Sequence, residues 1–290
     1  MMPRTTYRLR MMAFVATAAL AACEAQESPF APMRAANPMP MTKNIRVEDH
    51  FSGADLELAR AAARGDAAEV ARLVREKNAN PNAISREGMP LLLWPVQAGN
   101  REGTRALLEN GADPNLPLPR FGSPMVLVAM LDDPEWLRLL LDHGGDPNLQ
   151  NRDGEPLARV AMLHRNWESV KLLVERGADI NAGVHGFKSR SMLAYYAATG
   201  QFDKVHWLLT HGADPTVRLE AAADGANVGA PIVLEAIYWY PIDETRFPEL
   251  ADWQRKSQQW LRDNGIGEVP AEPDYRRRQR EEAGLPKPIH

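Results

Sequence analysis

Seven histidines and one pair of adjacent aspartates are the side chains of this chain that could serve acid–base or metal chemistry. No two histidines share the spacing of a zinc-binding helix, and neither a phosphate-binding glycine loop nor a Gly-x-Ser-x-Gly nucleophile turn occurs. Asp132 and Asp133 are neighbours, so their side chains project differently, and their position favours a turn or capping role over catalysis. We therefore expect no catalytic residue, cofactor or metal, and a cryptic enzyme is the weakest alternative.

The single cysteine, Cys23, is the other reactive group, and a basic, then apolar segment precedes it. Its parts are Arg4, Arg8 and Arg10, followed by the uncharged run 11–22, which is too short to cross a bilayer as a helix. The ending Leu20-Ala21-Ala22-Cys23 resembles the bacterial lipoprotein signal. That resemblance implies a signal peptide over 1–22 and lipidation of Cys23, whereas an ordinary signal peptide is the alternative.

Lipidation would place the protein in the bacterial cell envelope, facing the periplasm. Glu24 stands where an aspartate usually directs inner-membrane retention, so the outer membrane is the preferred location. Two or three acyl chains give a permanent anchor, since one chain alone binds only marginally. Residues 23–50 contain four prolines and no amphipathic period, and we expect them to form the lipidated cysteine and a flexible tether.

The charge and the cysteine count of the chain exclude two classes of protein, disulfide-rich domains and nucleic-acid-binding proteins. The 290 residues carry a net charge of -4 with a single cysteine. A single thiol cannot form an intramolecular disulfide. The negative net charge also argues against a nucleic-acid-binding protein, which would need a concentrated Lys/Arg surface. Removing residues 1–22 deletes three arginines and no acidic residue, so the mature charge is -4 minus 3, or -7.

The remainder of the chain repeats with a fixed period. The motif Gly-Ala-Asp-Pro-Asn or a close variant occupies residues 111–115, 144–148, 177–181 and 212–216, and a degenerate copy occupies 79–82. Successive copies are 33, 33, 33 and 35 residues apart. An apolar helical pattern precedes each copy, and a shorter one, such as 91–97 or 192–198, lies further upstream. The pattern therefore predicts that each unit consists of a hairpin, a first helix, a tight turn and a second helix.

This pattern resembles the ankyrin repeat over residues 55–215, with a degenerate last unit over 231–265. The resemblance implies an all-α repeat solenoid of about five to six units including degenerate caps, over residues 51–268. Histidines such as His143 and His211, two units apart, would then lie about 20 Å from each other and could not share a metal. Residues 269–290 predict a charged C-terminal tail that is solvated, with lipid headgroup contact as the alternative.

Ankyrin proteins typically bind partners through their hairpin tips and first helices. An alignment of the units brings basic and aromatic residues to successive hairpins: Arg86, Arg120, Phe121, Arg152, Phe187, Lys188 and Arg190. Such a row could receive the carboxylates of a partner, although solvated arginines are an equal alternative. Tyr238 and Trp239, at the end of the last first helix, are expected to be exposed aromatic contacts. Five other aromatics are expected to pack inside: Trp94, Trp136, Trp167, Tyr195 and Trp207.

We expect a lipid-anchored protein–protein interaction module. The lipoprotein start, residues 144–149 and the closing segment 260–266 look similar to ankyrin lipoproteins found beside type VI secretion phospholipase effectors. This resemblance implies an immunity protein that binds and neutralises a secreted phospholipase toxin. A structural or chaperone-like periplasmic adaptor is the alternative. The partner is expected to be a protein, with the membrane reached through the lipid and with no nucleic acid or small-molecule substrate.

Overall fold

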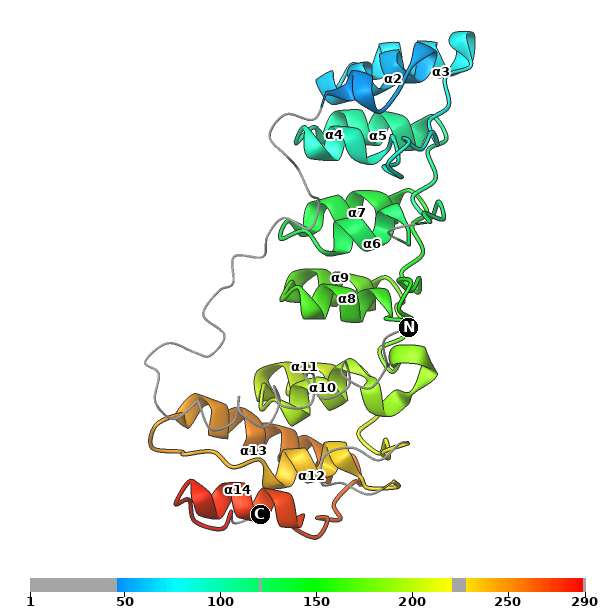
Figure 1. The fold of residues 1–290 in the computed structure, drawn as a ribbon. Coiled ribbons are helices and arrows are strands. Elements are labelled where there is room, and N and C mark those ends of the chain that lie inside the picture. Colours follow the sequence, from blue (N-terminus) through cyan, green and yellow to red (C-terminus); the bar gives the residue numbers. More distant parts are fainter. Residues whose placement is uncertain (1–45, 120–121, 221–227, 289–290) are drawn as a thin grey trace, which may run out of the picture. The chain divides into compact units, whose positions relative to one another are not determined.

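The computed structural model describes residues 46–119, 122–220 and 228–288 (Figure 1). Cys23, the predicted signal peptide, most of the predicted tether, Arg120 and Phe121 lie outside the described residues. The helices are η1 (Val47–Asp49), α2 (Gly53–Arg64), α3 (Ala67–Lys77), α4 (Leu93–Gln97), α5 (Arg101–Glu109), α6 (Pro124–Ala129), α7 (Pro134–Asp142), α8 (Leu157–Leu163), α9 (Trp167–Glu175), η2 (Val184–Gly186), η3 (Lys188–Arg190), α10 (Met192–Ala198), α11 (Phe202–Thr210), α12 (Ile232–Trp239), α13 (Pro248–Asp263) and α14 (Asp274–Glu282).

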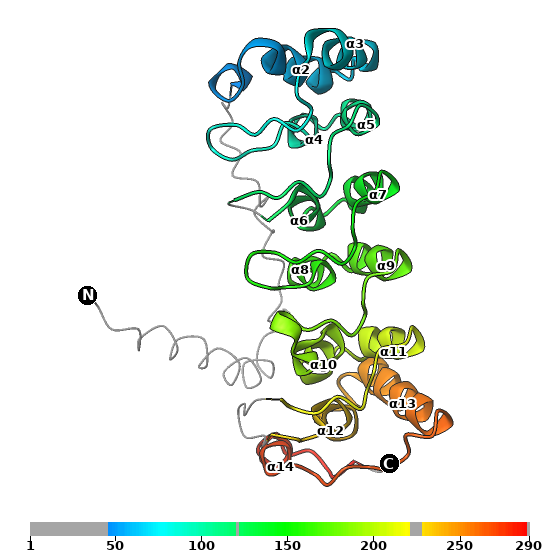
Figure 2. The ribbon, with the colours of Figure 1, turned by 90° about the vertical axis from the view of Figure 1, so that its right-hand side faces the viewer.

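Consecutive helices form antiparallel pairs that stack in two rows. The first helices α2, α4, α6, α8, α10 and α12 form one row, and the second helices α3, α5, α7, α9, α11 and α13 form the other (Figure 2). A loop, which we call a finger, precedes each first helix from α4 to α12. Fingers 1 to 5 are residues 83–90, 116–123, 149–156, 182–191 and 217–230, of which 120–121 and 221–227 lie outside the described residues. The predicted all-α repeat solenoid is confirmed, and α10 has the predicted bounds of 192–198.

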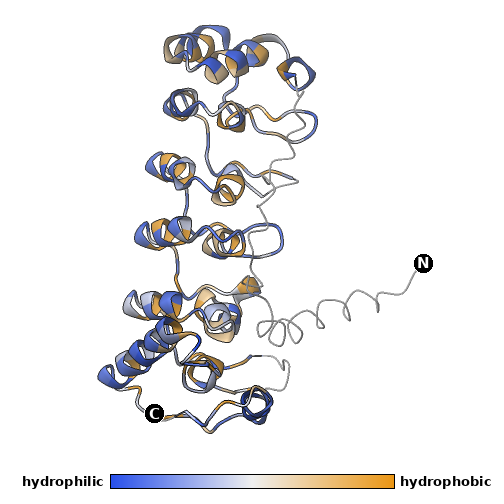
Figure 3. Ribbon diagram, turned by 90° about the vertical axis from the view of Figure 1, so that its left-hand side faces the viewer, coloured by the Kyte–Doolittle hydropathy of each residue, from blue (hydrophilic) through white to orange (hydrophobic). Residues whose placement is uncertain are grey.

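Each helix pair contributes equivalent leucines to one continuous core. Leu107, Leu140, Leu173 and Leu208 recur at the repeat period and are all fully buried. Burying one such side chain contributes about 1.5–3 kcal/mol. Hydrophobic residues accordingly concentrate where the two rows of helices face each other (Figure 3).

The second helices from α5 to α13 are each followed by a left-handed glycine, whereas α3 ends at a left-handed Asn78. Gly144, for example, follows α7 with φ of 88°, a conformation that glycine adopts without strain. In several of these helices the residue before the glycine folds back onto its own helix: Asn110 donates to the Ala106 carbonyl, and Nδ1 of His143 lies 2.8 Å from the Leu139 carbonyl. His143 and its equivalent, His211, therefore act as helix caps in this structure.

One asparagine per unit connects successive units, and we call this series the asparagine ladder. Asn82, Asn115, Asn148 and Asn181 each donate a side-chain hydrogen bond to the glycine carbonyl of the next unit. Each also accepts one from the aspartate backbone N–H of that unit, at 2.7–2.8 Å. The next position along the chain is Thr216, whose hydroxyl bonds to Asp214 of its own turn instead.

The two ends of the repeat region are more ordered than expected. Residues 46–50 of the predicted tether pack against the first unit, where Arg60 pairs with Glu48. At the other end, the predicted solvated tail contains helix α14, which is strongly hydrophilic in Figure 3 yet places Arg276 over the ring of Tyr240, the residue that follows α12. Many of the described residues 269–288 are exposed, as predicted for a solvated tail, but Arg276, Glu272 and Arg280 are largely buried, so the segment is not solvated throughout. The sequence pattern misses this helix because its buried contact residue is an arginine, Arg276.

Candidate partner-binding surface

Fingers 1 and 3 have the same backbone turn, and each carries one predicted arginine at the same position of it. The Gly88 N–H donates to the Ser85 carbonyl at 2.9 Å, and the Gly154 N–H donates to the Asn151 carbonyl at 3.1 Å. An antiparallel bridge closes each finger just before its first helix begins. Arg86 and Arg152 directly follow the carbonyl residue of their turns, so the repeat places both at the tips of their fingers.

Arg86 and Arg152 are exposed, and within the described residues neither guanidinium has an ion pair or hydrogen bond. The exposed arginines of the second helices differ in this respect. Arg105 pairs with Glu102 and Arg138 pairs with Glu135, each within its own helix at 3.0–3.1 Å. The finger arginines therefore keep their full set of donors available to a molecule outside the chain.

Finger 4 presents an aromatic ring between basic side chains. Phe187 is 38% exposed, and the guanidinium carbon of Arg190 lies 5.1 Å from its ring centroid, within cation–π distance. Lys188 is exposed beside them. The structure thus brings three of the predicted residues together on one finger.

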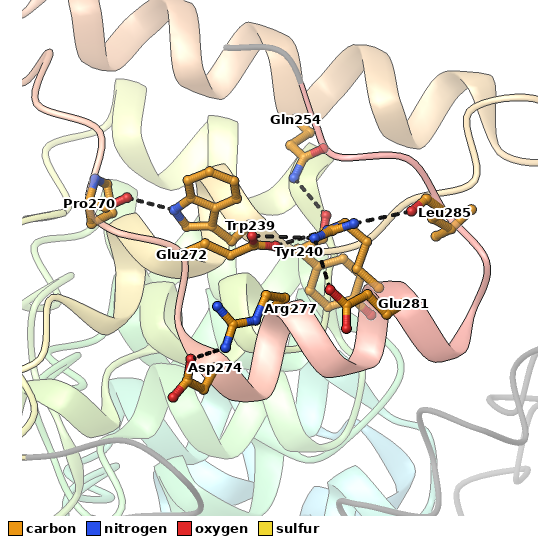
Figure 4. A network of polar contacts seen from close by, with 10 residues as sticks. Trp239, Tyr240, Gln254, Pro270, Glu272, Asp274, Arg277, Glu281 and Leu285 are labelled. Carbon is orange, nitrogen blue, oxygen red and sulfur yellow. Dashed lines mark hydrogen bonds and ion pairs between the residues drawn. The ribbon is translucent and has the colours of Figure 1, made fainter.

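Tyr238 and Trp239 are buried, so the prediction that they form an exposed aromatic contact is wrong. Tyr238 is 0% exposed and Trp239 is 6% exposed. For Trp239 the cause is the C-terminal segment: the Trp239 Nε1 donates to the Pro270 carbonyl at 2.8 Å (Figure 4). In addition, Lys287 lies over the Trp239 ring.

Charged groups hold this C-terminal segment in place. Arg280 pairs with Glu272 at 2.9 Å, and both side chains are only 11% exposed. Arg276 lies over the Tyr240 ring at 5.0 Å. Glu235 of α12 is also buried, with one carboxylate oxygen unpaired, and this burial raises its pKa despite the positive charge of Arg276.

The other aromatic residues pack as expected in part. Trp94 and Trp136 are buried, whereas Trp167, Tyr195 and Trp207 are half-buried. The Trp167 and Trp207 rings meet edge to face at 5.2 Å, which links α9 to α11. These residues therefore act mainly in packing between units.

Five exposed apolar side chains among the described residues were not predicted from the sequence. Leu163, at the end of α8, is 49% exposed, Ile84 of finger 1 is 40% exposed, and the others are Val228, Phe247 and Val269. Residue type alone does not distinguish these positions from buried apolar ones. Single exposed apolar residues are common on soluble proteins.

The structure also bears on the acidic pair, on metal binding and on membrane-spanning helices. Asp133 is the N-cap of α7, and its side chain accepts from the Glu135 N–H, so the predicted capping role is confirmed. Within the described residues, His, Cys, Asp and Glu side chains form no group of three or more suited to a metal ion. No helix among those residues is long and apolar enough to cross a membrane.

Comparisons with known proteins agree with this architecture. Residues 125–218 match the family model of ankyrin repeats, in three copies. Among solved structures, the chain is similar to the ankyrin repeat domain of Bcl-3, a unique member of the IkappaB protein family. That likeness has 23% identity and a TM-score of 0.53, and covers 71% of this chain and 85% of that chain. At this identity the likeness shows the fold alone. No curated protein matches the chain.

Proposed function

Since the chain is folded as an ankyrin-repeat solenoid, an interaction scaffold, we propose that it binds another protein through its fingers. The observation that carries this proposal is the pair Arg86 and Arg152, which stand at equivalent finger tips without partners among the described residues. An arginine offers two parallel donors to a carboxylate, so the fingers are suited to an acidic partner surface.

We further propose that the protein acts from the bacterial envelope, lipid-anchored through Cys23 and facing the periplasm. The support is the lipoprotein-like segment that ends at Cys23. In this setting, the proposed partner is a secreted phospholipase toxin that the fingers bind and neutralise. A permanent anchor would keep the fingers close to the bilayer that such a toxin attacks.

The test of partner binding co-expresses this chain with a secreted phospholipase toxin of a type VI secretion system, directed to the periplasm of a sensitive host. We expect the wild-type protein to protect the host and to form a stable complex with the toxin. Substituting Arg86, Arg120 and Arg152 together by glutamate should abolish both effects, because each substitution replaces a donor group with a repelling charge.

The matched control is the double variant Arg105→Glu/Arg138→Glu. These arginines are also exposed, but they lie on second helices, away from the fingers. The control should protect as well as wild type. Protection by the triple variant would refute the finger interface. Co-purification with resident envelope proteins and no protection by wild type would favour the adaptor role.

The anchor has its own test. Cys23→Ser should move the protein from the membrane fraction to the soluble periplasm, with labelled palmitate no longer incorporated. Membrane association that persists in this variant would contradict lipidation at Cys23.

A further inference from the structure

Finger 4 departs from the regular fingers in length and backbone. The spacing from Asp179 to Asp214 is 35 residues instead of 33, and finger 4 takes up the extra residues. Fingers 1 and 3 are closed by a β-bridge, whereas finger 4 consists of the two short turns η2 and η3.

The first turn of finger 4 depends on the conformation of His185 and on the absence of a side chain at Gly183. His185 has φ of 53° and ψ of 28°, a left-handed conformation that costs free energy for any residue with a side chain. The Phe187 carbonyl folds back onto Gly183 so closely that a Cβ at Gly183 would lie 1.6 Å from its oxygen. Finger 4 is therefore held in one defined shape.

Both neighbouring fingers support that shape. The His185 N–H donates to the Gly154 carbonyl of finger 3 at 3.2 Å, and the His185 ring lies where a side chain at position 154 would stand. On the other side, the Ser189 N–H and hydroxyl both donate to one oxygen of Glu220 in finger 5, each at 3.1 Å. These contacts order finger 4 before any partner arrives, which lowers the entropic cost of binding.

Finger 4 exposes the aromatic ring of Phe187 beside two basic side chains, Lys188 and Arg190. Arg190 covers one part of the exposed Phe187 ring, and Lys188 stands beside it. No described carboxylate pairs with Lys188 or Arg190. A strained, supported loop that exposes an aromatic ring beside arginine has the composition of a binding hot spot.

We propose that finger 4 is the anchor of the partner interface, and that it receives an aromatic side chain flanked by carboxylates on an acidic segment of the partner protein. The aromatic side chain packs on Phe187, while the carboxylates pair with Lys188 and Arg190. This inference rests on the proposed function and adds to it the chemistry of the bound segment.

The test compares two fluorescein-labelled polymers of equal length, poly-glutamate and a random copolymer of glutamate and tyrosine. Both carry carboxylates, but only the copolymer carries aromatic rings. By fluorescence anisotropy, wild type should bind both and should prefer the copolymer by about two- to tenfold, the range expected from one aromatic pair.

Phe187→Ala should lose this preference and keep its affinity for poly-glutamate, while Phe187→Tyr should retain the preference. The matched control is Phe247→Ala, because Phe247 is 43% exposed and stacks with Arg246 at 5.2 Å but lies outside the fingers. This control should bind as wild type does. Circular dichroism would verify that every variant is folded.

The outcomes separate the two proposals. A preference for the copolymer that survives Phe187→Ala, or no preference in wild type, overturns the role of finger 4 and leaves an acidic partner in place. Failure of wild type to bind either polymer overturns both the acidic partner and the anchor.

Discussion

Asn148 offers a direct test of how the units are coupled. Its side chain donates to the Gly177 carbonyl at 3.0 Å and accepts from the Asp179 N–H at 2.8 Å. Both partners belong to the turn that follows α9, one unit further along the chain. Asn148→Ala removes both hydrogen bonds and leaves the helices and the leucine core unchanged.

The expected cost follows from these two bonds. A neutral hydrogen bond contributes about 1 kcal/mol net, a value that already includes the exchange of protein–water for protein–protein bonds. We expect a loss of about 2 kcal/mol in the free energy of unfolding. For a repeat domain of this size, that loss lowers Tm by roughly 4–8 °C.

The assay combines thermal unfolding with hydrogen exchange. Asn148→Ala should lower Tm and should speed exchange of the Asp179 amide, which loses its acceptor. The matched control is Asn110→Ala, since Asn110 donates only to the Ala106 carbonyl of its own helix. This control should cost about 1 kcal/mol and leave the next unit protected. Equal Tm values for the two variants, with an Asp179 amide still protected, would refute coupling through the ladder.

Three further predictions concern the C-terminal segment and finger 4. Burial raises the pKa of Glu235 in the folded state, so the stability that this group contributes is present below its unfolded pKa and is lost as pH rises through the folded pKa. Glu235→Gln should therefore unfold at higher urea concentration than wild type at pH 8, and the difference should vanish near pH 4. Arg280→Ala removes the pair with Glu272 and should release α14, seen as a red-shifted emission of Trp239 and tryptic cleavage within 274–282; an unchanged digestion pattern would contradict this. Gly183→Ala should distort finger 4 and lower Tm by a few degrees, since the new Cβ would meet a carbonyl oxygen; a crystal structure with finger 4 unchanged would refute the clash.

The sequence predicted the regular units because each of their boundaries has a local physical cause. The glycine at the end of a second helix, the aspartate of the following turn and the alternation of buried leucines act within a few residues of each other. Helix α10 illustrates this, since Ser191 caps its first turn and the apolar segment 192–198 ends where the turn begins. The arginines of fingers 1 and 3 were found for the same reason, because the period alone aligns them.

The departures arise where contacts between distant segments decide the structure. Trp239 is an aromatic residue at the end of a first helix, where the sequence predicts an exposed contact, and the segment around Pro270 covers it and makes it a core residue. The segment that covers Trp239 reads as a solvated tail, because cation–π contacts and one ion pair hold it instead of an apolar stripe. Likewise, the left-handed conformation of His185 cannot be read from residue type alone, and it is accompanied by a hydrogen bond from the His185 N–H to the Gly154 carbonyl of finger 3.

The hydrogen bonds of the asparagine ladder join residues that lie before a finger to the turn after the following second helix, and they include no residue of the finger itself. Finger 4 is longer than its neighbours, and Asn181 still accepts from the Asp214 N–H at 2.8 Å, the distance found in the regular units. Its second ladder bond, to the Gly212 carbonyl, lengthens to 3.4 Å but is kept, so the longer loop is accommodated with the ladder still in place. In evolutionary terms, the loops can diversify independently of the frame that carries them. The same separation suits the protein to loop grafting, in which a recognition sequence is exchanged while the supporting repeats stay as they are.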